Sequence, residues 1–228
     1  MLFIFWMYMN KSIKYLRKFE TEYIHRHWKN GYFYEQFELN YIKDMLGSNR
    51  RIVDVGANIG NHAIYFDKIM NSEVIYVIEP NEQLYCILLQ NVALNYCHKV
   101  NVDYLGLALG YEENNCFIEN EEMIECNNFG LSKINLNKTG NVSVMRGDSL
   151  FCDIPIDLLK IDVEGMELQV LQGFEKTINR YKPVLYLEIQ NDNNEVIMNY
   201  INKICYKVVK KFNTTQNEGY TNYILISK

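Results

Sequence analysis

The chain has 228 residues, of which 48% are hydrophobic, and a formal net charge of −5. This length and apolar content suit one α/β domain with a modest extension and exclude an intrinsically disordered chain. An acidic chain without a basic block has no electrostatic footprint for duplex nucleic acid, which argues against a nucleic-acid partner and leaves only a local basic groove open.

The first 48 residues are predicted to form a helical extension, and residues 49–228 the main domain. Residues 1–9 are strongly apolar, but they are too short to span a membrane and lack a basic region and cleavage site typical of a signal peptide. We expect them to pack on the domain, the alternative being a truncated anchor. Over residues 10–48, Phe33, Phe37 and Tyr41 recur at helical spacing, and Gly47 marks a stop.

Strand and helix patterns alternate over the next sixty residues. Strands are predicted at 51–55, 73–78 and 100–105, and helices at 61–70 and 82–95. This alternation is typical of a parallel, doubly wound α/β sheet.

The alternation is interrupted between residues 106 and 150. Short β segments around 116–119, 131–134 and 142–145, with turns at Asn127-Asn128 and Thr139-Gly140, predict a small β insertion over one end of the sheet. Strands at 156–162 and 184–189, helices at 166–174 and 196–204, and a closing hairpin of 206–212 and 220–227 complete the domain.

The strand at 51–55 runs directly into a glycine-rich turn and then a helix. The turn reads Val53-Asp54-Val55-Gly56-Ala57-Asn58-Ile59-Gly60-Asn61. Glycines allow the backbone to approach a ligand closely, and a helix N-terminus offers free amides. The spacing Gly56-x-x-x-Gly60 does not match the G-x-G-x-x-G fingerprint of dinucleotide sites.

An acidic residue follows at the end of the next strand, in Val77-Ile78-Glu79-Pro80-Asn81. A carboxylate at this place accepts hydrogen bonds from both hydroxyls of a ribose in dinucleotide enzymes. The alternative is a helix-capping carboxylate, but the separation from the glycine turn favours the ribose role.

Together these residues resemble the FkbM family of class I methyltransferases. The turn matches the D-x-G-x-x-x-G pattern of that class, and Leu158-Leu159-Lys160-Ile161-Asp162-Val163-Glu164-Gly165-Met166-Glu167 resembles the second signature of the family. The resemblance covers about residues 30–190. It is weakest between 106 and 150, from which we expect contacts to the methyl acceptor.

The resemblance implies a Rossmann-like, seven-stranded sheet whose last strand is antiparallel, with S-adenosylmethionine as the cofactor. It implies O-methylation of a hydroxyl or carboxyl group on a sugar-containing or other small molecule. The cofactor-binding residues that it suggests are Asp54, Gly56, Ala57, Asn58, Gly60, Asn61, Glu79, Pro80, Asn81 and Asp162.

Four polar residues are the predicted catalytic group: Lys160, Asp162, Glu164 and Glu188. Lys160 and Asp162 lie two apart on one strand and so share a face. A charged lysine in an apolar run needs a partner, and Asp162 and Glu188 are the candidates. One member of the group would orient or deprotonate the acceptor. The alternative is a structural ion pair between strands. No metal is predicted, although the acidic groups leave Mg²⁺ conceivable.

Four further residues have open roles. Tyr34-Glu35 resembles a pair ahead of the glycine turn in the family, and is either part of the pocket or an ordinary surface pair. His62 either lies near the cofactor or faces solvent at the start of a helix, which is the favoured alternative. Glu167 is either a substrate contact or a surface residue on a first helical turn.

Two other functions remain open besides O-methylation. One is a non-catalytic cofactor-binding or scaffold protein, and the other is a methyltransferase for protein or nucleic acid. The amino-group methylation motif Asn/Asp-Pro-Pro-Tyr/Phe is absent where Asp162-Val163-Glu164-Gly165 stands. The six cysteines form no C-x-x-C pair, so free thiols in a reducing compartment are expected, which together with the absence of a signal peptide indicates a cytoplasmic protein. The sequence does not indicate an oligomeric state.

Overall fold

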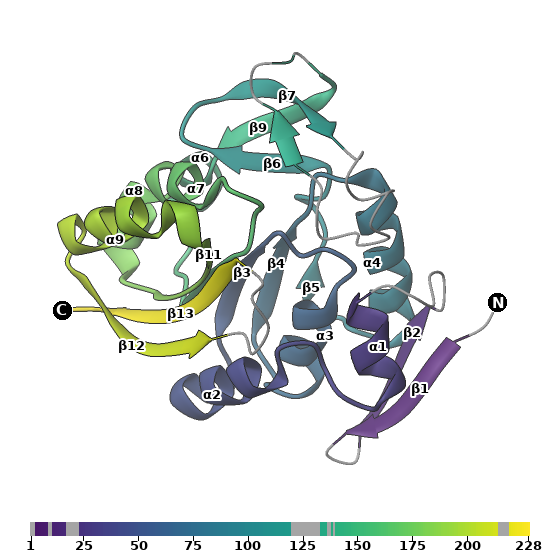
Figure 1. Cartoon of the computed structure of the whole chain (residues 1–228). Coiled ribbons are helices and arrows are strands. Elements are labelled where there is room, and N and C mark those ends of the chain that lie inside the picture. The colour runs from purple at the N-terminus through teal and green to yellow at the C-terminus, as the bar shows by residue number, and fades with distance from the viewer. Residues whose placement is uncertain are drawn as a thin grey trace.

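A seven-stranded mixed sheet forms the centre of the molecule (Figure 1). The computed structural model describes residues 3–8, 11–16, 23–119, 133–135, 138, 140–213 and 219–228. In spatial order the strands are β12 (Tyr206–Asn213), β13 (Tyr220–Ser227), β11 (Val184–Gln190), β10 (Leu158–Ile161), β3 (Arg51–Val55), β4 (Val74–Ile78) and β5 (Val100–Asn101).

The pairing of these strands confirms the predicted topology. From β11 to β5 all neighbours are parallel, whereas β13 runs antiparallel to both β11 and β12. The chain order changes direction between β3 and β10, because β4 and β5 lie on one side of β3 and the later strands on the other. Ligands of open α/β sheets bind outside the carboxyl ends of the strands at such a switch point.

Helices cover both faces of the sheet. On one face, α1 (Tyr23–Lys29), α2 (Gln36–Leu46), α3 (Asn61–Lys68) and α4 (Glu82–Leu94) contribute to a core cluster that includes Ile52 of β3. On the other, α6 (Gly147–Phe151), α7 (Glu167–Gly173), α8 (Glu175–Tyr181) and α9 (Asn194–Lys203) contribute to a second cluster that includes Val53. Adjacent residues of β3 therefore serve opposite cores, as the pleat of a strand requires.

A small sheet crosses one end of the main sheet, at the top of Figure 1. Its order is β6 (Leu107–Gly110), β9 (Val142–Arg146), β7 (Asn114–Glu119) and β8 (Lys133–Asn135). These strands confirm the predicted β insertion, although β6 was not expected. The predicted turn at Asn127-Asn128, and Thr139 of the second turn, lie outside the described residues.

The prediction of a helical extension is correct for α1 and α2 and wrong before them. There, β1 (Phe3–Tyr8) and β2 (Lys11–Leu16) form an antiparallel hairpin. The buried Ile13 and Tyr15 alternate with the less buried Lys14, which is the period of a strand and not of a helix. Gly47 ends α2 with a φ of 73°, as predicted.

The strand predicted at 100–105 ends at Asn101. The amide of Gly106 donates to the carbonyl oxygen of Glu79 at 2.9 Å, so the chain crosses toward β4 instead of continuing beside it. Residues 107–110 can then enter the small sheet as β6. A short apolar run does not show where the chain leaves the main sheet, so the sequence pattern predicted a strand that continues to residue 105.

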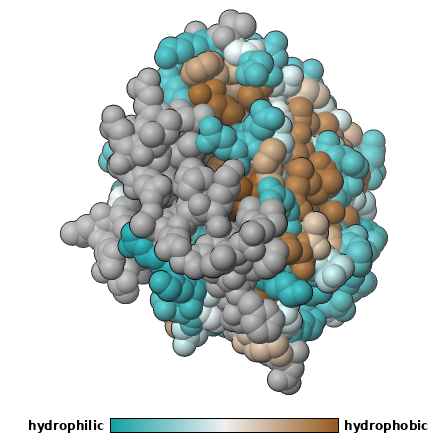
Figure 2. Space-filling view, turned by 90° about the vertical axis from the view of Figure 1, so that its right-hand side faces the viewer, coloured by the Kyte–Doolittle hydropathy of each residue, from teal (hydrophilic) through white to brown (hydrophobic). Residues whose placement is uncertain are grey.

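The side of the molecule that carries α4 and the β1–β2 hairpin shows a band of apolar surface between hydrophilic regions (Figure 2). Leu89 of α4 is among the exposed apolar residues, with 39% of its surface accessible. Among the described helices, none has the length and apolar character needed to cross a membrane.

The glycine turn provides a test of the fold. Gly56 and Gly31 both have left-handed backbones, with φ of 78° and 80°, but a Cβ at Gly56 would lie 1.8 Å from the carbonyl oxygen of Asp162, whereas nothing lies within 4 Å at Gly31. We expect Gly31→Ala to lower the free energy of unfolding by about 1 kcal/mol for backbone strain alone. Gly56→Ala should cost a further ~1–3 kcal/mol for the overlap. Urea unfolding of both variants measures the difference, and equal losses would contradict the close approach.

Candidate functional site

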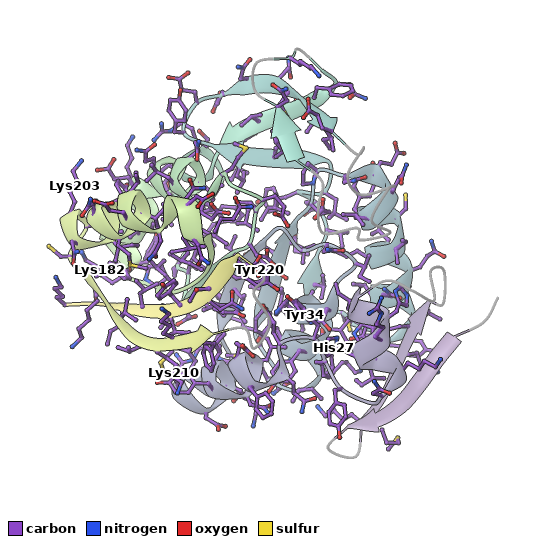
Figure 3. The ribbon with its side chains drawn as sticks, in the orientation of Figure 1. His27, Tyr34, Lys182, Lys203, Lys210 and Tyr220 are labelled. Carbon is purple, nitrogen blue, oxygen red and sulfur yellow. The ribbon has the colours of Figure 1, made fainter. Side chains whose placement is uncertain are left out.

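A cavity of about 530 Å³ lies at the carboxyl ends of β3, β4, β10 and β11. This volume is within the range of about 300–1,000 Å³ typical of small-molecule sites. Its wall combines the glycine turn, the end of β4, the loop after β10, and residues of the small sheet such as Ile118 and Ile134. Tyr34 and Tyr220, far apart in sequence, also line it, and they lie side by side near the centre of Figure 3, with their hydroxyl oxygens 3.2 Å apart.

The glycine turn is held open by its backbone. Gly56, Asn58 and Gly60 have φ values of 78°, 50° and 89°. The amides of Gly56 and Ala57 both donate to the carbonyl oxygen of Ile78 at 3.0 Å, which ties the turn to the end of β4. Because a side chain at position 56 would meet the backbone of Asp162, only glycine lets these two chain segments approach.

A buried ammonium group joins the two central strands directly below this turn. Lys160 Nζ lies 3.0 Å from Asp54 Oδ1, 3.2 Å from Asp162 Oδ2 and 3.2 Å from the carbonyl oxygen of Gly56. Burial alone would lower the pKa of Lys160, but the charges of Asp162 and Asp54 raise it, so the side chain is charged. Asp162 is thus confirmed as a partner of Lys160. The other partner is Asp54 and not Glu188, which was the second candidate.

Glu79 lies at the end of β4 and forms part of the cavity wall. Its two oxygens accept hydrogen bonds from the backbone amides of Asn58 and Asn81, each at 2.9 Å. Burial raises the pKa of Glu79 to about 7, against the opposing effect of these two hydrogen bonds. A carboxylate fixed in this way has lone pairs left for hydroxyl groups of a ligand.

All three asparagines predicted as cofactor contacts, Asn58, Asn61 and Asn81, border the cavity, and the side chains of Asn61 and Asn81 also make structural hydrogen bonds. Asn61 Oδ1 accepts from Trp28 Nε1 at 2.8 Å and from the amide of Tyr34, while Nδ2 donates to the carbonyl oxygen of Tyr34. Asn81 caps α4 by accepting from the amide of Gln83. Asn61 therefore fastens the N-terminal segment to the start of α3.

The predicted acidic residues form one wall of the cavity. Asp162, Glu164 and Glu188 all line it, and Glu164 accepts a hydrogen bond from Gln190 at 3.1 Å. Burial raises the pKa of Glu188 well above its usual value, and the charges of Asp162, Glu35 and Glu164 raise it further. Glu188 therefore keeps its proton to higher pH than an ordinary carboxyl group. In the described part of the chain, no group of three or more His, Cys, Asp and Glu side chains is arranged to hold a metal ion.

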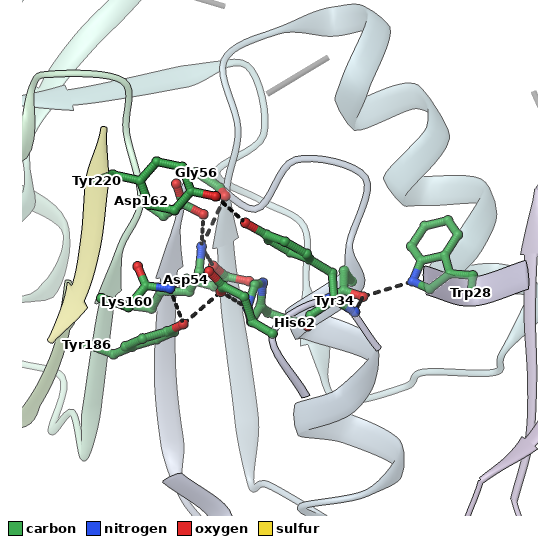
Figure 4. Close-up of polar contacts among 12 residues, drawn as sticks. Trp28, Tyr34, Asp54, Gly56, His62, Lys160, Asp162, Tyr186 and Tyr220 are labelled. Atoms are coloured by element: carbon green, nitrogen blue, oxygen red, sulfur yellow. Dashed lines mark hydrogen bonds and ion pairs between the residues drawn. The ribbon is translucent and has the colours of Figure 1, made fainter. Parts of the chain in front are cut away.

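Glu35 has an unexpected place behind this wall. Its carboxylate accepts hydrogen bonds from His62 Nε2 at 2.9 Å, from the hydroxyl of Tyr186 at 2.7 Å, and from Asn222 Nδ2. Figure 4 shows Tyr34 and Tyr220 meeting near the Lys160 group, with Tyr186 and His62 lower in the same view. Tyr34 thus lines the cavity while Glu35 is buried behind it, and neither belongs to an ordinary surface pair.

His62 is also buried, with 5% of its surface accessible, and it lines the cavity. The favoured expectation of a solvent-facing histidine at the helix start is therefore wrong. The only signal for it in the sequence was its position directly after the glycine turn. Glu167 is buried as well and does not line the cavity, and its carboxylate accepts from the amide of Gly165 at 2.9 Å.

Comparison with known proteins adds to this geometry. The Methyltransferase FkbM domain matches residues 54–208. The chain belongs to the FkbM family of S-adenosylmethionine-dependent methyltransferases. A search of curated proteins finds no match to this FkbM-family chain.

Among solved structures, the methyltransferase FkbM from Methylobacillus flagellatus KT is similar, with a TM-score of 0.55 and 22% identity over 78% of this chain. The match spans 44% of that longer protein. The ribosomal protein L11 methylase from Lactobacillus delbrueckii subsp. bulgaricus has a TM-score of 0.54 and 13% identity, over 90% of this chain and 79% of that one. At such identities these structures show the shared fold alone.

We predict that the affinity for S-adenosylhomocysteine rises about tenfold between pH 6 and 8, because the ribose role expected of Glu79 requires an ionised carboxylate and the pKa of Glu79 is about 7. Over the same interval the free energy of unfolding should fall, since the folded protein binds this proton more tightly than the unfolded chain. Calorimetric titration at several pH values measures the affinity. Glu79→Gln should flatten its pH dependence.

Glu167→Gln is the matched control, because burial also raises the pKa of Glu167 to about 7 but the residue does not line the cavity. It should leave the pH dependence of binding unchanged while altering that of stability. If Glu79→Gln and Glu167→Gln changed binding alike, the ribose role of Glu79 would be wrong.

A second prediction concerns the buried ammonium. Lys160→Met should lower the free energy of unfolding by about 3–5 kcal/mol, since it leaves the fully buried Asp54 without its counter-charge. The double variant Asp54→Asn with Lys160→Met should recover part of this loss. Arg180→Met, which breaks the exposed pair with Asp153, should change stability little. Urea unfolding compares the four proteins, and a Lys160→Met variant as stable as Arg180→Met would refute the assignment.

Proposed function

We propose that this protein transfers a methyl group from S-adenosylmethionine to a hydroxyl group of a neutral, sugar-containing or similarly hydroxylated small molecule. The amides and left-handed backbone of residues 56–60 would hold the methionine end of the cofactor, and Glu79 would hold its ribose. A Cβ at Gly56 would overlap the carbonyl oxygen of Asp162, so glycine is what allows the turn and the acidic loop to line one cavity. When bound, the cofactor supplies an electrophilic methyl group.

The observation that carries the proposal is the charge of the cavity wall. Its described lining contains five carboxyl groups, from Glu79, Asp162, Glu164, Glu188 and Asp192, and no lysine or arginine. The labelled Lys182, Lys203 and Lys210 lie toward the left edge of Figure 3, away from Tyr34 and Tyr220 of the cavity. Such a wall suits a cationic cofactor and an uncharged acceptor.

The same wall argues against the other acceptor classes. Nucleic acids are bound chiefly through their phosphates by lysine and arginine, which the described lining does not offer. A carboxylate acceptor would be repelled by the acidic side chains at close range. Of the two acceptor groups open from the sequence, hydroxyl and carboxyl, the hydroxyl is therefore favoured.

Hydrogen-bonding groups support a polyhydroxylated acceptor. The hydroxyls of Tyr34 and Tyr220 and the side chains of Glu188, Gln190 and Asn191 surround the part of the cavity farthest from Glu79 along the sheet. Sites built from such groups select substrates by hydrogen bonds, because an unpaired buried partner is costly. The raised pKa of Glu188 favours its protonated form, which can donate a hydrogen bond to an acceptor oxygen.

The residues predicted as catalytic divide into two groups in this proposal. Lys160, paired with Asp54 and Asp162, is a positioning residue that holds the turn and the acidic loop together. Asp162, Glu164 and Glu188 line the cavity and would contact the cofactor or the acceptor. Alignment of the reactants can supply about 7–11 kcal/mol of the barrier reduction in such reactions.

Calorimetry with S-adenosylhomocysteine tests the cofactor half of the proposal. The wild type should bind, and Glu79→Ala should weaken binding at least about tenfold by removing charge-assisted hydrogen bonds worth roughly 1.5–3 kcal/mol. Asp54→Ala should also weaken binding, through the turn. No heat of binding in a folded wild type would refute the function.

A methyl-transfer assay with radiolabelled cofactor tests the acceptor half. Neutral methyl glycosides and oligosaccharides should accept label, and a deoxy analogue lacking the target hydroxyl should not. Uronic acids and transfer RNA are the comparison acceptors. Transfer to RNA in preference to glycans would overturn the acceptor class, and cofactor binding without transfer to any acceptor would support the non-catalytic alternative.

A further inference from the structure

A buried histidine–glutamate pair behind the cavity offers a role that the sequence did not reveal. Glu35 precedes α2 with a left-handed φ of 55°, an arrangement that costs a non-glycine residue about 1–2 kcal/mol. Residues in such conformations persist only where their surroundings hold them, and they cluster at functional sites. Here the side chains from α3, β11 and β13 converge on the carboxylate.

These contacts keep Glu35 charged. Burial alone would raise the pKa of Glu35, but the hydrogen bond from His62, the hydroxyl of Tyr186 and the charge of Lys160 oppose this, and the pKa is lowered on balance. An ionised carboxylate has no proton to donate, so the hydrogen between it and His62 belongs to Nε2.

The hydrogen bond to Glu35 leaves the other ring nitrogen, Nδ1, outside this pair. In a neutral imidazole with hydrogen on Nε2, Nδ1 carries a lone pair and acts as a hydrogen-bond acceptor. No described residue forms a hydrogen bond with Nδ1 of His62, whose ring borders the cavity. The groups that face this ring are Glu35, Glu38, Tyr34 and Tyr186.

The other polar groups of the wall are less suited to take a proton. Asp162 is held by Lys160, and Glu164 accepts a hydrogen bond from Gln190. Burial and the neighbouring carboxylates oppose ionisation of Glu188, so its pKa is raised and it keeps its proton to higher pH than an ordinary carboxyl group. His62 differs from these groups in having a buried carboxylate, Glu35, that stabilises the cation formed when the ring takes a proton.

We propose that His62 is the general base that removes the proton of the acceptor hydroxyl, and that Glu35 is the positioning residue that fixes its tautomer and stabilises the imidazolium that forms. The arrangement has the logic of a base oriented by a buried carboxylate. This inference rests on the proposed hydroxyl methylation.

The reaction balances with these groups. The acceptor O–H gives its proton to His62 Nδ1 while the oxygen forms a bond to the methyl carbon. The bond between that carbon and sulfur breaks, and its electron pair remains on sulfur. The positive charge thus moves from the sulfonium to the imidazolium beside Glu35, and the imidazolium later releases its proton to solvent.

Nuclear magnetic resonance tests the tautomer without needing an acceptor. Protein labelled with ¹⁵N-histidine and saturated with S-adenosylhomocysteine should show His62 at pH 7.5 as a neutral ring with hydrogen on Nε2. His62→Gln assigns its signals, and His98→Asn removes those of an exposed histidine as a control. Hydrogen on Nδ1, in the neutral ring or in an imidazolium persisting to pH 8, would overturn the proposal.

Kinetics test the role with whichever glycoside accepts label. His62→Gln should lower kcat by about 10²–10⁴-fold, the usual contribution of a placed base, with unchanged affinity for S-adenosylhomocysteine. Glu35→Gln should lower kcat less and shift the acidic limb of its pH profile. Tyr186→Phe, which keeps the His62–Glu35 bond, should change kcat far less than either.

The possible failures are distinguishable. If the folded wild type does not bind the cofactor, the proposed function is refuted. If His62→Gln binds the cofactor normally and its kcat is unaltered, only the assignment of His62 as the general base is refuted. Thermal melting of each variant identifies loss of folding, and the resonance measurement on the wild type decides the tautomer if a variant does not fold.

Discussion

The ammonium group of Lys160 is the constraint on which the site depends. It lies with less than 2% of its surface accessible, bonded to Asp54 of β3, to Asp162 after β10 and to the backbone of Gly56. Two parallel strands that separate at their carboxyl ends are thereby tied at the point where their loops diverge. An unpaired charge there would be prohibitively costly, so the pairing fixes the relative position of the glycine turn and the acidic loop.

The N-terminal segment is joined to the site by a second set of buried contacts. Trp28 and the backbone of Tyr34 bond to Asn61, and Glu35 bonds to His62, so the first two residues of α3 anchor the segment. Ile13 and Trp28 belong to the same apolar cluster as Ile64 of α3. The segment is therefore part of the cavity wall and of the core. Buried contacts of this segment therefore cross residue 48, where the sequence pattern predicts the boundary between extension and domain.

The parts of the fold and of the site that could be predicted are those indicated by residues close together in the sequence. The strand before Gly56, the turn itself and Glu79 are close together in sequence, and each pattern has one physical reading, so β3, β4 and the cavity at their ends were expected correctly. Lys160 was expected to need an acidic partner because a buried charge always does.

The unpredicted parts depend on residues distant in sequence. Glu35 meets Tyr186 and Asn222 across separations of 151 and 187 residues, and nothing near residue 35 indicates that strands so far along the chain will supply its hydrogen bonds. The prediction for residues 3–16, which form the β1–β2 hairpin, was wrong for a different reason. Six-residue strands give too few periods to separate a strand from a helix, and packing of Ile13 and Tyr15 decides between them.

The acidic wall of the cavity and the His62–Glu35 pair behind it have different electrostatic roles in the proposed reaction. Carboxylates on the wall attract a cationic cofactor, but the same negative field would hinder formation of an alkoxide from the acceptor. A neutral base resolves this conflict, because it takes the proton without adding negative charge and becomes a cation where the sulfonium charge disappears. The buried Glu35 carboxylate, unable to reach the acceptor itself, then faces the imidazolium as it forms. The acidity of the cavity and the burial of a histidine–glutamate pair behind it are therefore parts of one electrostatic arrangement.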